Sequence, residues 1–280
     1  MPMPRTFVIF GVAGFVISVY YNYPISDILS KFSFEKFNYL WTSLVAKTSS
    51  YDGYSYMLAQ QWPISACILE VHQKSRGISR TTKDCRFPPS IQTWTIHGIW
   101  PGKKGGSFPS YCGGKQLDGS DISNITEELN TRWPTIKNFD PNIKFWQYQW
   151  HKHGTCFQDE PSLSTPYLYF SKALELNRKY DLNAAFKHCK ILPNDSVKYS
   201  SNDLIGCIKN YFNWNAQIYL AYSRDNSFRN GDRILVEVRM CFDKNDTAAD
   251  CYAGSPSEFY YPSSVENKYS SSIFTRFIGG

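Results

Sequence analysis

Two tryptophan-flanked histidine segments decide the fold and the chemistry that this sequence predicts. They read Trp94-Thr-Ile-His97-Gly-Ile-Trp100-Pro101 and Phe145-Trp-Gln-Tyr148-Gln149-Trp-His-Lys152-His153-Gly-Thr-Cys156. Alternating side chains over 91–97 predict a strand with His97 on its more polar face. Residues 145–153 are predicted to form a helix that ends at Gly154.

The second segment brings polar side chains together. Gln149, Lys152 and His153 are spaced i, i+3 and i+4, so on a helix they share one face. Trp146 and Trp150 are also one turn apart and are expected to pack into the core from another face. A rigid helix is therefore expected to present the polar side chains to a cleft.

Hydrophobic periodicity predicts strands at both ends of a domain, with helices between them. Strands are expected over 54–62, 218–222 and 234–242, and helices from Thr165-Pro166 onward and over 202–212. The apolar residues alternate over 218–222 and, more strongly, over 234–242. This order of elements indicates the α+β class.

The composition is that of a folded protein without a strong electrostatic signature. The chain has 280 residues, a hydrophobic fraction of 42%, an aromatic fraction of 17% and a net charge of +6. The basic residues are scattered, and no basic tract of the kind that binds duplex DNA is present. The aromatic excess suits a protein that stacks on flat ligands such as bases.

The N-terminus has the pattern of a secretory signal. Arg5 precedes an apolar run from Phe7 to about Tyr21, shorter than the roughly 20 residues of a spanning helix. We expect a signal peptide or uncleaved signal anchor over 1–21, an extension or stem over 22–53, a folded domain over 54–265 and a C-terminal tail over 266–280. The expected localisation is the secretory pathway, with a secreted, lysosomal or vacuolar destination, and membrane contact is expected only through an uncleaved anchor.

An even number of cysteines behind a signal segment indicates a disulfide framework. The cysteines are Cys67, Cys85, Cys112, Cys156, Cys189, Cys207, Cys241 and Cys251. None are spaced C-x-x-C, which argues against zinc knuckles and thioredoxin-type chemistry. N-glycosylation sequons begin at Asn124, Asn194 and Asn245, each in a polar, turn-like stretch.

The two histidine segments resemble the active-site segments of the ribonuclease T2 family. The matching residues are Thr95-Ile-His97-Gly-Ile-Trp100-Pro101, Phe145-Trp146 and Trp150-x-Lys152-His153-Gly-Thr-Cys156. The similarity runs from about Tyr54 to about Pro262. It implies a T2-like catalytic domain with an antiparallel central sheet, flanking helices and disulfide bonds.

The resemblance implies an endoribonuclease that cleaves single-stranded RNA, and not DNA, through a 2′,3′-cyclic phosphate. No metal ion or other cofactor is implied, and a monomer is expected. By the family pattern His153 is the base, His97 is the acid, and Lys152 stabilises the phosphorane. An ordinary histidine pKa near 6.5 allows one neutral and one protonated imidazole at mildly acidic pH. Trp100 and Phe145 match positions near the base-binding sites and are expected to stack on bases.

The disulfide pairing follows the same resemblance, because eight cysteines allow 105 full pairings. The resemblance implies Cys67–Cys85, Cys112–Cys156 and Cys241–Cys251, which leaves Cys189–Cys207 as the fourth pair. The second of these is expected to hold the two catalytic histidines in one cleft.

Two positions of the second segment depart from the family pattern. Tyr148 stands where the family usually has a third histidine, and Gln149 stands where it usually has a catalytic glutamate. Glutamine can hydrogen-bond to phosphate oxygens but carries no charge to stabilise an imidazolium, and tyrosine can still donate to phosphate. We therefore expect a weakened enzyme. Gly102 replaces an aspartate that some members use in base recognition, so no base preference is implied.

Three function classes stay open at this point. The first is an active ribonuclease of the T2 type. The second is a T2-like protein that binds RNA or a protein partner with little catalysis, which Tyr148 and Gln149 suggest. The third is a zinc protein with His151, His153 and Cys156 as ligands. It is disfavoured because the two histidines are two apart on a helix and because Cys156 is expected in a disulfide.

Overall fold

The computed structural model describes residues 6–12, 15–21, 55–72, 85, 93–102, 108–137, 140–214, 216–223, 231–251 and 256–263. By their contacts, the residues of the chain divide into two units, Met1–Asp52 and Gly53–Gly280. Within the described ranges, no helix is both long enough and apolar enough to cross a membrane. The predicted stem over 22–53 and tail over 266–280 lie outside the described residues.

The first unit contains an antiparallel hairpin. Strand β1 (Thr6–Val12) pairs along its length with β2 (Phe15–Tyr21). The hairpin covers the apolar run for which a signal segment is predicted. That interpretation concerns targeting, which the pairing of these strands does not test, so it stays a prediction.

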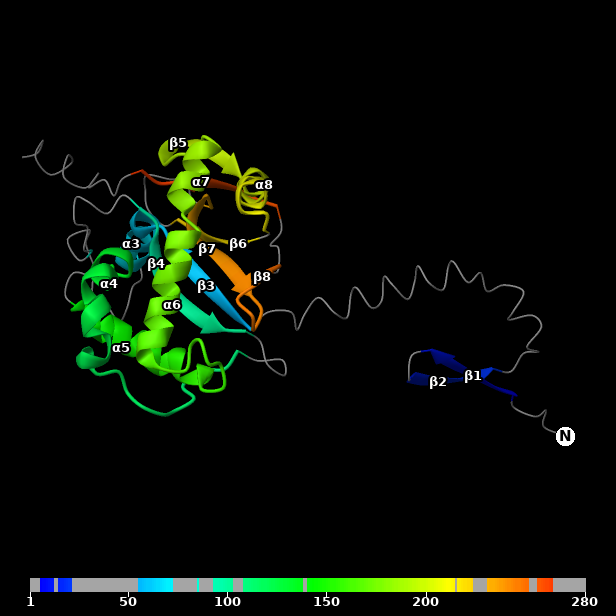
Figure 1. Ribbon diagram of the computed structural model, residues 1–280. Helices are drawn as coiled ribbons and strands as arrows, with labels where there is room; N and C mark the ends of the chain where they lie inside the picture. The colour runs from blue at the N-terminus through cyan, green and yellow to red at the C-terminus, as the bar shows by residue number, and fades with distance from the viewer. Residues whose placement is uncertain are drawn as a thin grey trace, which may run out of the picture. The chain divides into compact units, whose positions relative to one another are not determined.

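The second unit is organised around one sheet (Figure 1). Its strands are β3 (Tyr56–Gln61), β4 (Thr95–Pro101), β5 (Asn194–Ser200), β6 (Gln217–Tyr222), β7 (Arg233–Phe242), β8 (Ala248–Ala249) and β9 (Glu258–Tyr261). Their order is β4-β3-β7-β9-β5, with β6 and β8 also paired to β7. Among these strands every pair is antiparallel except β7 with β9, which run parallel. The α+β class is confirmed, with this one correction to the expected antiparallel sheet.

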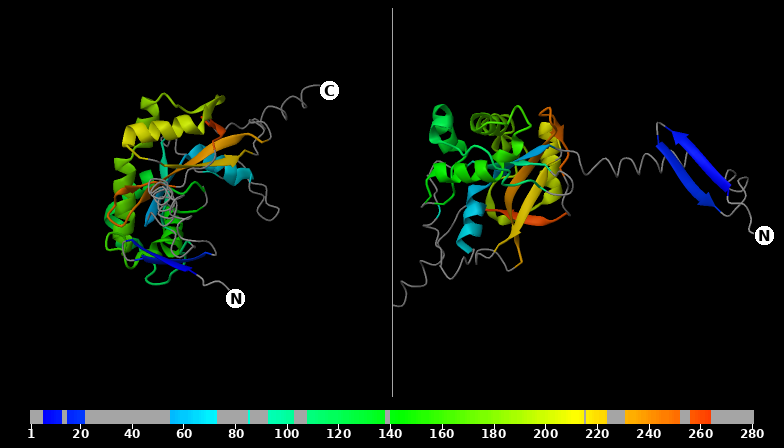
Figure 2. Two further views of the ribbon diagram at one scale, coloured as in Figure 1. Left: turned by 90° about the vertical axis from the view of Figure 1, so that its right-hand side faces the viewer. Right: turned by 90° about the horizontal axis from the view of Figure 1, so that it is seen from below.

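Helices cover both faces of the sheet. They are α3 (Pro63–His72), α4 (Thr126–Arg132), α5 (Asn142–Lys152), α6 (Pro166–Lys179), α7 (Leu182–His188) and α8 (Ser201–Phe212), with 3₁₀ segments η2 (Gly119–Ile125) and η3 (Gly154–Phe157). In Figure 1, α6 crosses the sheet in front of β3 and β4. The turned views of Figure 2 place α6 on one side of the sheet and α3 on the other.

Side-chain caps begin the helices of the second half of the domain. The Thr165 hydroxyl accepts a hydrogen bond from the amide of Leu168 at 3.3 Å, and Pro166 is the first residue of α6. Asp181 and Ser200 cap α7 and α8 in the same way. Such caps satisfy amides that have no partner within the helix. The predicted start of a helix at Thr165-Pro166 is confirmed.

Strand β7 is buried on both faces. Along this strand only Arg233 and Arg239 are partly exposed. The strand predicted over 234–242 is confirmed, and its burial on both faces goes beyond what the alternation of its apolar residues indicates. The physical reason is its central place in the sheet, where α3 packs on one side and the aromatic core lies on the other. The largest fully buried side chains of this core include Trp133, Trp146, Tyr169 and Phe170.

The covalent framework agrees with a chain that folds in an oxidising compartment. All four predicted disulfides are present, namely Cys67–Cys85, Cys112–Cys156, Cys189–Cys207 and Cys241–Cys251. Such bonds stabilise a domain mainly by restricting its unfolded chain. The sequon residues Asn124, Asn194 and Asn245 are exposed, and their glycosylation is a prediction.

A buried polar chain ties α6 to the sheet. Asn177 Nδ2 donates to Gln60 Oε1 on β3 at 2.8 Å, and Gln60 Nε2 donates to the carbonyl of Tyr180 at 3.0 Å. On its other side, Asn177 Oδ1 accepts from Arg132 Nη1 at 2.9 Å. Gln60 and Asn177 are 0% and 4% exposed, so neither amide has water as an alternative partner.

We expect Asn177→Ala to lower the free energy of unfolding by about 1–3 kcal/mol, because Gln60 Oε1 is then left buried without a donor. Urea denaturation followed by tryptophan fluorescence measures this change. The matched control is Asn210→Ala at an exposed position of α8, for which we expect a change below about 0.5 kcal/mol. Equal effects of the two substitutions would contradict the prediction.

Candidate active site

A bulge in strand β4 places His97. In the antiparallel pairing of β3 with β4, Ala59 lies opposite Gly98 and Gln60 lies opposite Ile96, so His97 is the extra residue on β4. Bulges re-aim side chains and are common beside active sites. The His97 side chain is 34% exposed, which leaves its ring accessible from solvent.

Buried aromatic donors hold the backbone around His97. Strand β4 lies at one end of the strand order, so the carbonyls on its outer edge need partners other than a strand. The Trp133 indole donates to the carbonyl of His97 at 3.1 Å, and the Tyr169 hydroxyl donates to that of Ile99 at 2.8 Å. Both aromatic side chains are fully buried. The helical layer therefore fixes the strand that carries His97.

A buried carboxylate on β7 contacts the His97 ring. His97 Nδ1 lies 2.6 Å from Glu237 Oε1, and the Glu237 side chain is 5% exposed. Arg239 Nε donates to the other carboxylate oxygen at 2.8 Å. Burial raises the pKa of the Glu237 carboxyl, but the hydrogen bond and charge of His97, together with Arg239, outweigh burial and hold that pKa below its ordinary value. Glu237 is therefore an anion at mildly acidic pH.

His153 lies where α5 ends. Its amide donates to the carbonyl of Gln149 at 2.9 Å, and Gly154 begins η3 directly after it. A Cβ at Gly154 would overlap the ring of Trp150, so this close approach requires glycine. The predicted end of the helix is confirmed, and its start lies a few residues before Phe145.

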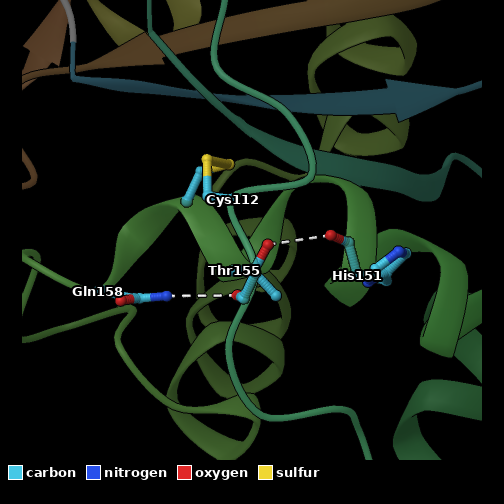
Figure 3. The surroundings of a disulfide bond; sticks show 6 residues. Cys112, His151, Thr155 and Gln158 are labelled. Atoms are coloured by element: carbon cyan, nitrogen blue, oxygen red, sulfur yellow. Dashed lines mark hydrogen bonds between the residues drawn. A yellow bond between two sulfur atoms is a disulfide. The ribbon is translucent and has the colours of Figure 1, made fainter.

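The Cys112–Cys156 disulfide joins the loop after β4 to η3 (Figure 3). Thr155 Oγ1 donates to the carbonyl of His151 at 2.9 Å. Gln158 Nε2 donates to the carbonyl of Gly113, the residue after Cys112, at 3.3 Å. The loop is thus bound to the segment that follows the histidine at the end of α5. A misplacement of about 1 Å in such a site costs about 100-fold in rate, so these contacts matter for positioning.

The indole of Trp100 contacts both imidazoles. Its ring centroid lies 5.1 Å from that of His97, edge to face, and 5.6 Å from that of His153. The Arg239 guanidinium lies 5.3 Å from the same indole. Two histidines from separate elements therefore contact the same indole ring.

The two imidazoles have different electrostatic surroundings. Burial, the charge of Lys152 and the charge of His97 lower the pKa of His153 to about 3. His97 instead has a carboxylate oxygen of Glu237 2.6 Å from its Nδ1. At mildly acidic pH the site therefore holds a neutral His153 beside an imidazole that contacts a carboxylate anion.

Gln149 on α5 is buried against strand β4. Its side chain is 2% exposed, and its Oε1 has no hydrogen-bond partner among the described residues. A Cβ at Gly98 would approach this oxygen to 2.6 Å, so the amide packs directly against β4. The expectation that Gln149 is presented to the cleft together with Lys152 needs this correction, because the bulged strand covers it.

Tyr148 and Lys152 form a polar pair at the exposed side of α5. Tyr148 is 47% exposed, and Lys152 Nζ donates to its hydroxyl at 3.1 Å. Phe145 is half-buried and packs against the core. The expected base stacking on Trp100 and Phe145 stays a prediction, as do the roles of His97, Lys152, His153 and Gln149.

The zinc alternative loses one of its ligands. The Cys156 sulfur is bonded to Cys112 and is not available as a thiolate beside His151 and His153. Within the described ranges, no group of three histidine, cysteine, aspartate or glutamate side chains could hold a metal ion.

Glu237 and Arg239 are the site residues that the sequence analysis does not identify. Glu237 lies 140 residues after His97, so local spacing cannot connect them. The available signal is an acidic residue within an otherwise apolar strand, which indicates a buried and partnered charge. The alternation of 234–242 identifies the apolar positions of the strand and gives no partner for Glu237.

Comparisons with known proteins give one family. Residues 53–251 match the model of the Ribonuclease T2 family. Ribonuclease 1 of Arabidopsis thaliana is 32% identical over 205 residues, covering 71% of this chain and 80% of the relative. Ribonuclease Oy of Magallana gigas is 28% identical over 222 residues, covering 76% of this chain and 97% of the relative. A structure of a ribonuclease MC1 variant in complex with 5′-GMP, a protein from bitter gourd seeds, aligns with a TM-score of 0.61 at 27% identity, over 74% of this chain and 100% of that one.

We expect Lys152→Gln to raise the pKa of His153 above its value of about 3, because the substitution removes a cation that disfavours the imidazolium. The pKa should stay below 6.5, since burial is the larger cause. An NMR titration of the histidine ring protons measures the change. Lys144→Gln, at an exposed position near the start of α5, is the matched control and should leave the titration of His153 in place. An unchanged pKa in Lys152→Gln would refute the assignment of this cause.

Proposed function

The chain belongs to the ribonuclease T2 family and is an endoribonuclease of the T2 type, and we propose that it cleaves single-stranded RNA without a metal ion, through a 2′,3′-cyclic phosphate. In this reaction the ribose 2′-hydroxyl attacks the adjacent phosphorus, and the bond from phosphorus to the 5′-oxygen breaks. DNA lacks this hydroxyl and is therefore no substrate.

The observation that carries the proposal is the pair of imidazoles on the Trp100 indole. A general base must be neutral, and the lowered pKa of His153, about 3, keeps it neutral in mild acid. A general acid must be oriented toward the leaving oxygen, and the contact of His97 Nδ1 with the Glu237 carboxylate leaves Nε2 for that role. His153 accepts the 2′-hydroxyl proton, and His97 gives its Nε2 proton to the leaving 5′-oxygen.

Charge and stacking supply the other roles. Lys152 is a cation whose charge acts on the base, and it stabilises the negative phosphorane. The hydroxyl of Tyr148, already in contact with Lys152, donates to a phosphate oxygen. Trp100 and Phe145 stack on the bases beside the cleaved bond.

The proposed enzyme works at a reduced rate. When His153 takes the proton, an imidazolium forms in a buried place next to Lys152. At Gln149 the neutral amide cannot stabilise that charge as a carboxylate would. The burial of this side chain makes the deficit larger, because water does not replace the missing charge.

The proposed compartment is the secretory pathway. The four disulfides form in oxidising compartments, and the exposed sequons are accessible to glycosylation there. The apolar N-terminal run is the proposed targeting segment. Secretion, or delivery to a lysosome or vacuole, follows from this route.

We expect the purified protein to cleave RNA in EDTA and to leave 2′,3′-cyclic phosphate ends, and His97→Ala to lower the rate by about 10²- to 10⁴-fold. Cleavage of a labelled oligonucleotide at pH 5, with mass spectrometry of the ends, provides both measurements. His188→Ala is the matched control, since His188 is exposed on α7 and contacts Tyr211. Activity lost in EDTA and restored by zinc would overturn the metal-independent mechanism.

We expect Gln149→Glu to raise the cleavage rate roughly tenfold, because one pKa unit of stabilisation of the imidazolium corresponds to that factor. Single-turnover kinetics measures the change. Gln147→Glu adds the same charge to an exposed position of the same helix and should leave the rate near that of the unmodified protein. A folded Gln149→Glu protein that is no faster would show that the site is adapted to the amide.

The alternative of an RNA-binding protein with little catalysis is favoured by the same two residues, Tyr148 and Gln149. It predicts tight binding of single-stranded RNA with no cleavage in the unmodified protein. Fluorescence anisotropy and the cleavage assay on the same oligonucleotide separate the two functions.

A further inference from the structure

We propose that Glu237 is the positioning residue for His97: its carboxylate holds the imidazole with Nδ1 toward β7 and Nε2 toward the cleft. From the sheet, it supplies the site with the negative charge that α5 lacks at Gln149. The catalytic consequence rests on the proposed function. The contact between the two side chains does not.

The contact has the geometry of a strong, shielded hydrogen bond. The distance from Nδ1 to Oε1 is 2.6 Å, and the carboxylate is 5% exposed. Hydrogen bonds to an ionised acceptor are shorter and stronger than neutral ones, and low local polarity strengthens them further. Because the Trp133 indole fixes the carbonyl of His97, the remaining freedom of this residue is the rotation of its side chain. Glu237 restricts that rotation and selects the tautomer with hydrogen on Nδ1.

Glu237 is itself held in place. Arg239 Nε and Nη2 each lie 2.8 Å from Oε2, which leaves Oε1 for His97. The guanidinium lies 4.7 Å from the ring centroid of Tyr219 on β6 and 5.3 Å from that of Trp100. The carboxylate therefore cannot turn away from the imidazole without breaking its contacts with Arg239.

The charges around His97 make this carboxylate necessary. On β7, the Glu237 carboxylate contacts the His97 ring and Arg239 contacts that carboxylate. At the end of α5, the charges of Lys152 and His97 both lower the pKa of His153, so these groups lie within electrostatic reach of one another. Arg239 and Lys152 are cations and disfavour an imidazolium. Among the described residues, the carboxylate bonded to the ring is that of Glu237. In the proposed reaction His97 loses the Nε2 proton to the 5′-oxygen and keeps the Nδ1 proton in its bond to Glu237.

The test is Glu237→Gln, which keeps the size and an acceptor but removes the charge. We expect the midpoint of the His97 ring titration, followed by NMR, to move to lower pH by about one unit, corresponding to a tenfold change in proton affinity. This measurement needs no RNA. The titration therefore tests the interaction of Glu237 with His97 independently of catalysis. Failure of the unmodified protein to cleave RNA would refute the proposed function and leave this test valid.

The pH profile of cleavage separates positioning from a merely structural role. In Glu237→Gln we expect the basic limb of kcat/KM to move down by the same unit, with a rate about 10- to 100-fold lower at pH 7. The acidic limb, set by His153, should stay in place. A structural defect would lower the rate equally at every pH and would move neither limb.

Two further variants keep the proposal falsifiable. Arg239→Gln removes a cation and should move the His97 midpoint to higher pH, so it tests the pair even if Glu237→Gln fails to fold. Glu258→Gln, at an exposed position of β9 in the same sheet, is the matched control and should change neither midpoint nor profile. The proposal is overturned if the His97 midpoint does not move in Glu237→Gln or Arg239→Gln, taking whichever of these variants fold.

Discussion

The carbonyls of the edge strand β4 need hydrogen-bond donors, and the architecture of this domain depends on how they are supplied. A buried carbonyl without a partner costs about 1–3 kcal/mol. Here the Trp133 indole and the Tyr169 hydroxyl donate to β4 from the helical layer, at 3.1 and 2.8 Å. The same two side chains are among the largest of the core. Packing and hydrogen bonding thus require one placement of the helices, which in turn holds the strand that carries His97.

This placement lets each imidazole take its properties from a different part of the fold. His97 lies on β4, and its ring contacts the carboxylate of Glu237 on β7. His153 ends a helix, is largely buried and has the Lys152 cation next to it. Trp100 then brings the two rings against one surface. Two side chains of the same type therefore have different electrostatic surroundings within one site.

The sequence predicts those parts of this site that are local. The helix that ends at Gly154 follows from spacing, and the two histidine segments carry the family resemblance together with the disulfide pairing. The bulge at His97 does not follow, because register depends on the partner strand. The burial of Gln149 depends on that bulge. Glu237 was missed because β7 alternates like a half-exposed strand, whereas its central position in the sheet buries both faces.

The burial of His153 also links folding to acidity. In the unfolded chain an imidazole titrates near pH 6.5, whereas the pKa of His153 in the folded domain is about 3. Between these values the unfolded chain binds a proton that the folded domain does not. The free energy of unfolding therefore falls as the pH is lowered through this range. The four disulfides act in the opposite sense, since they disfavour the unfolded chain at every pH. A base that stays neutral in acid thus makes the domain acid-sensitive, and cross-linking offsets that sensitivity.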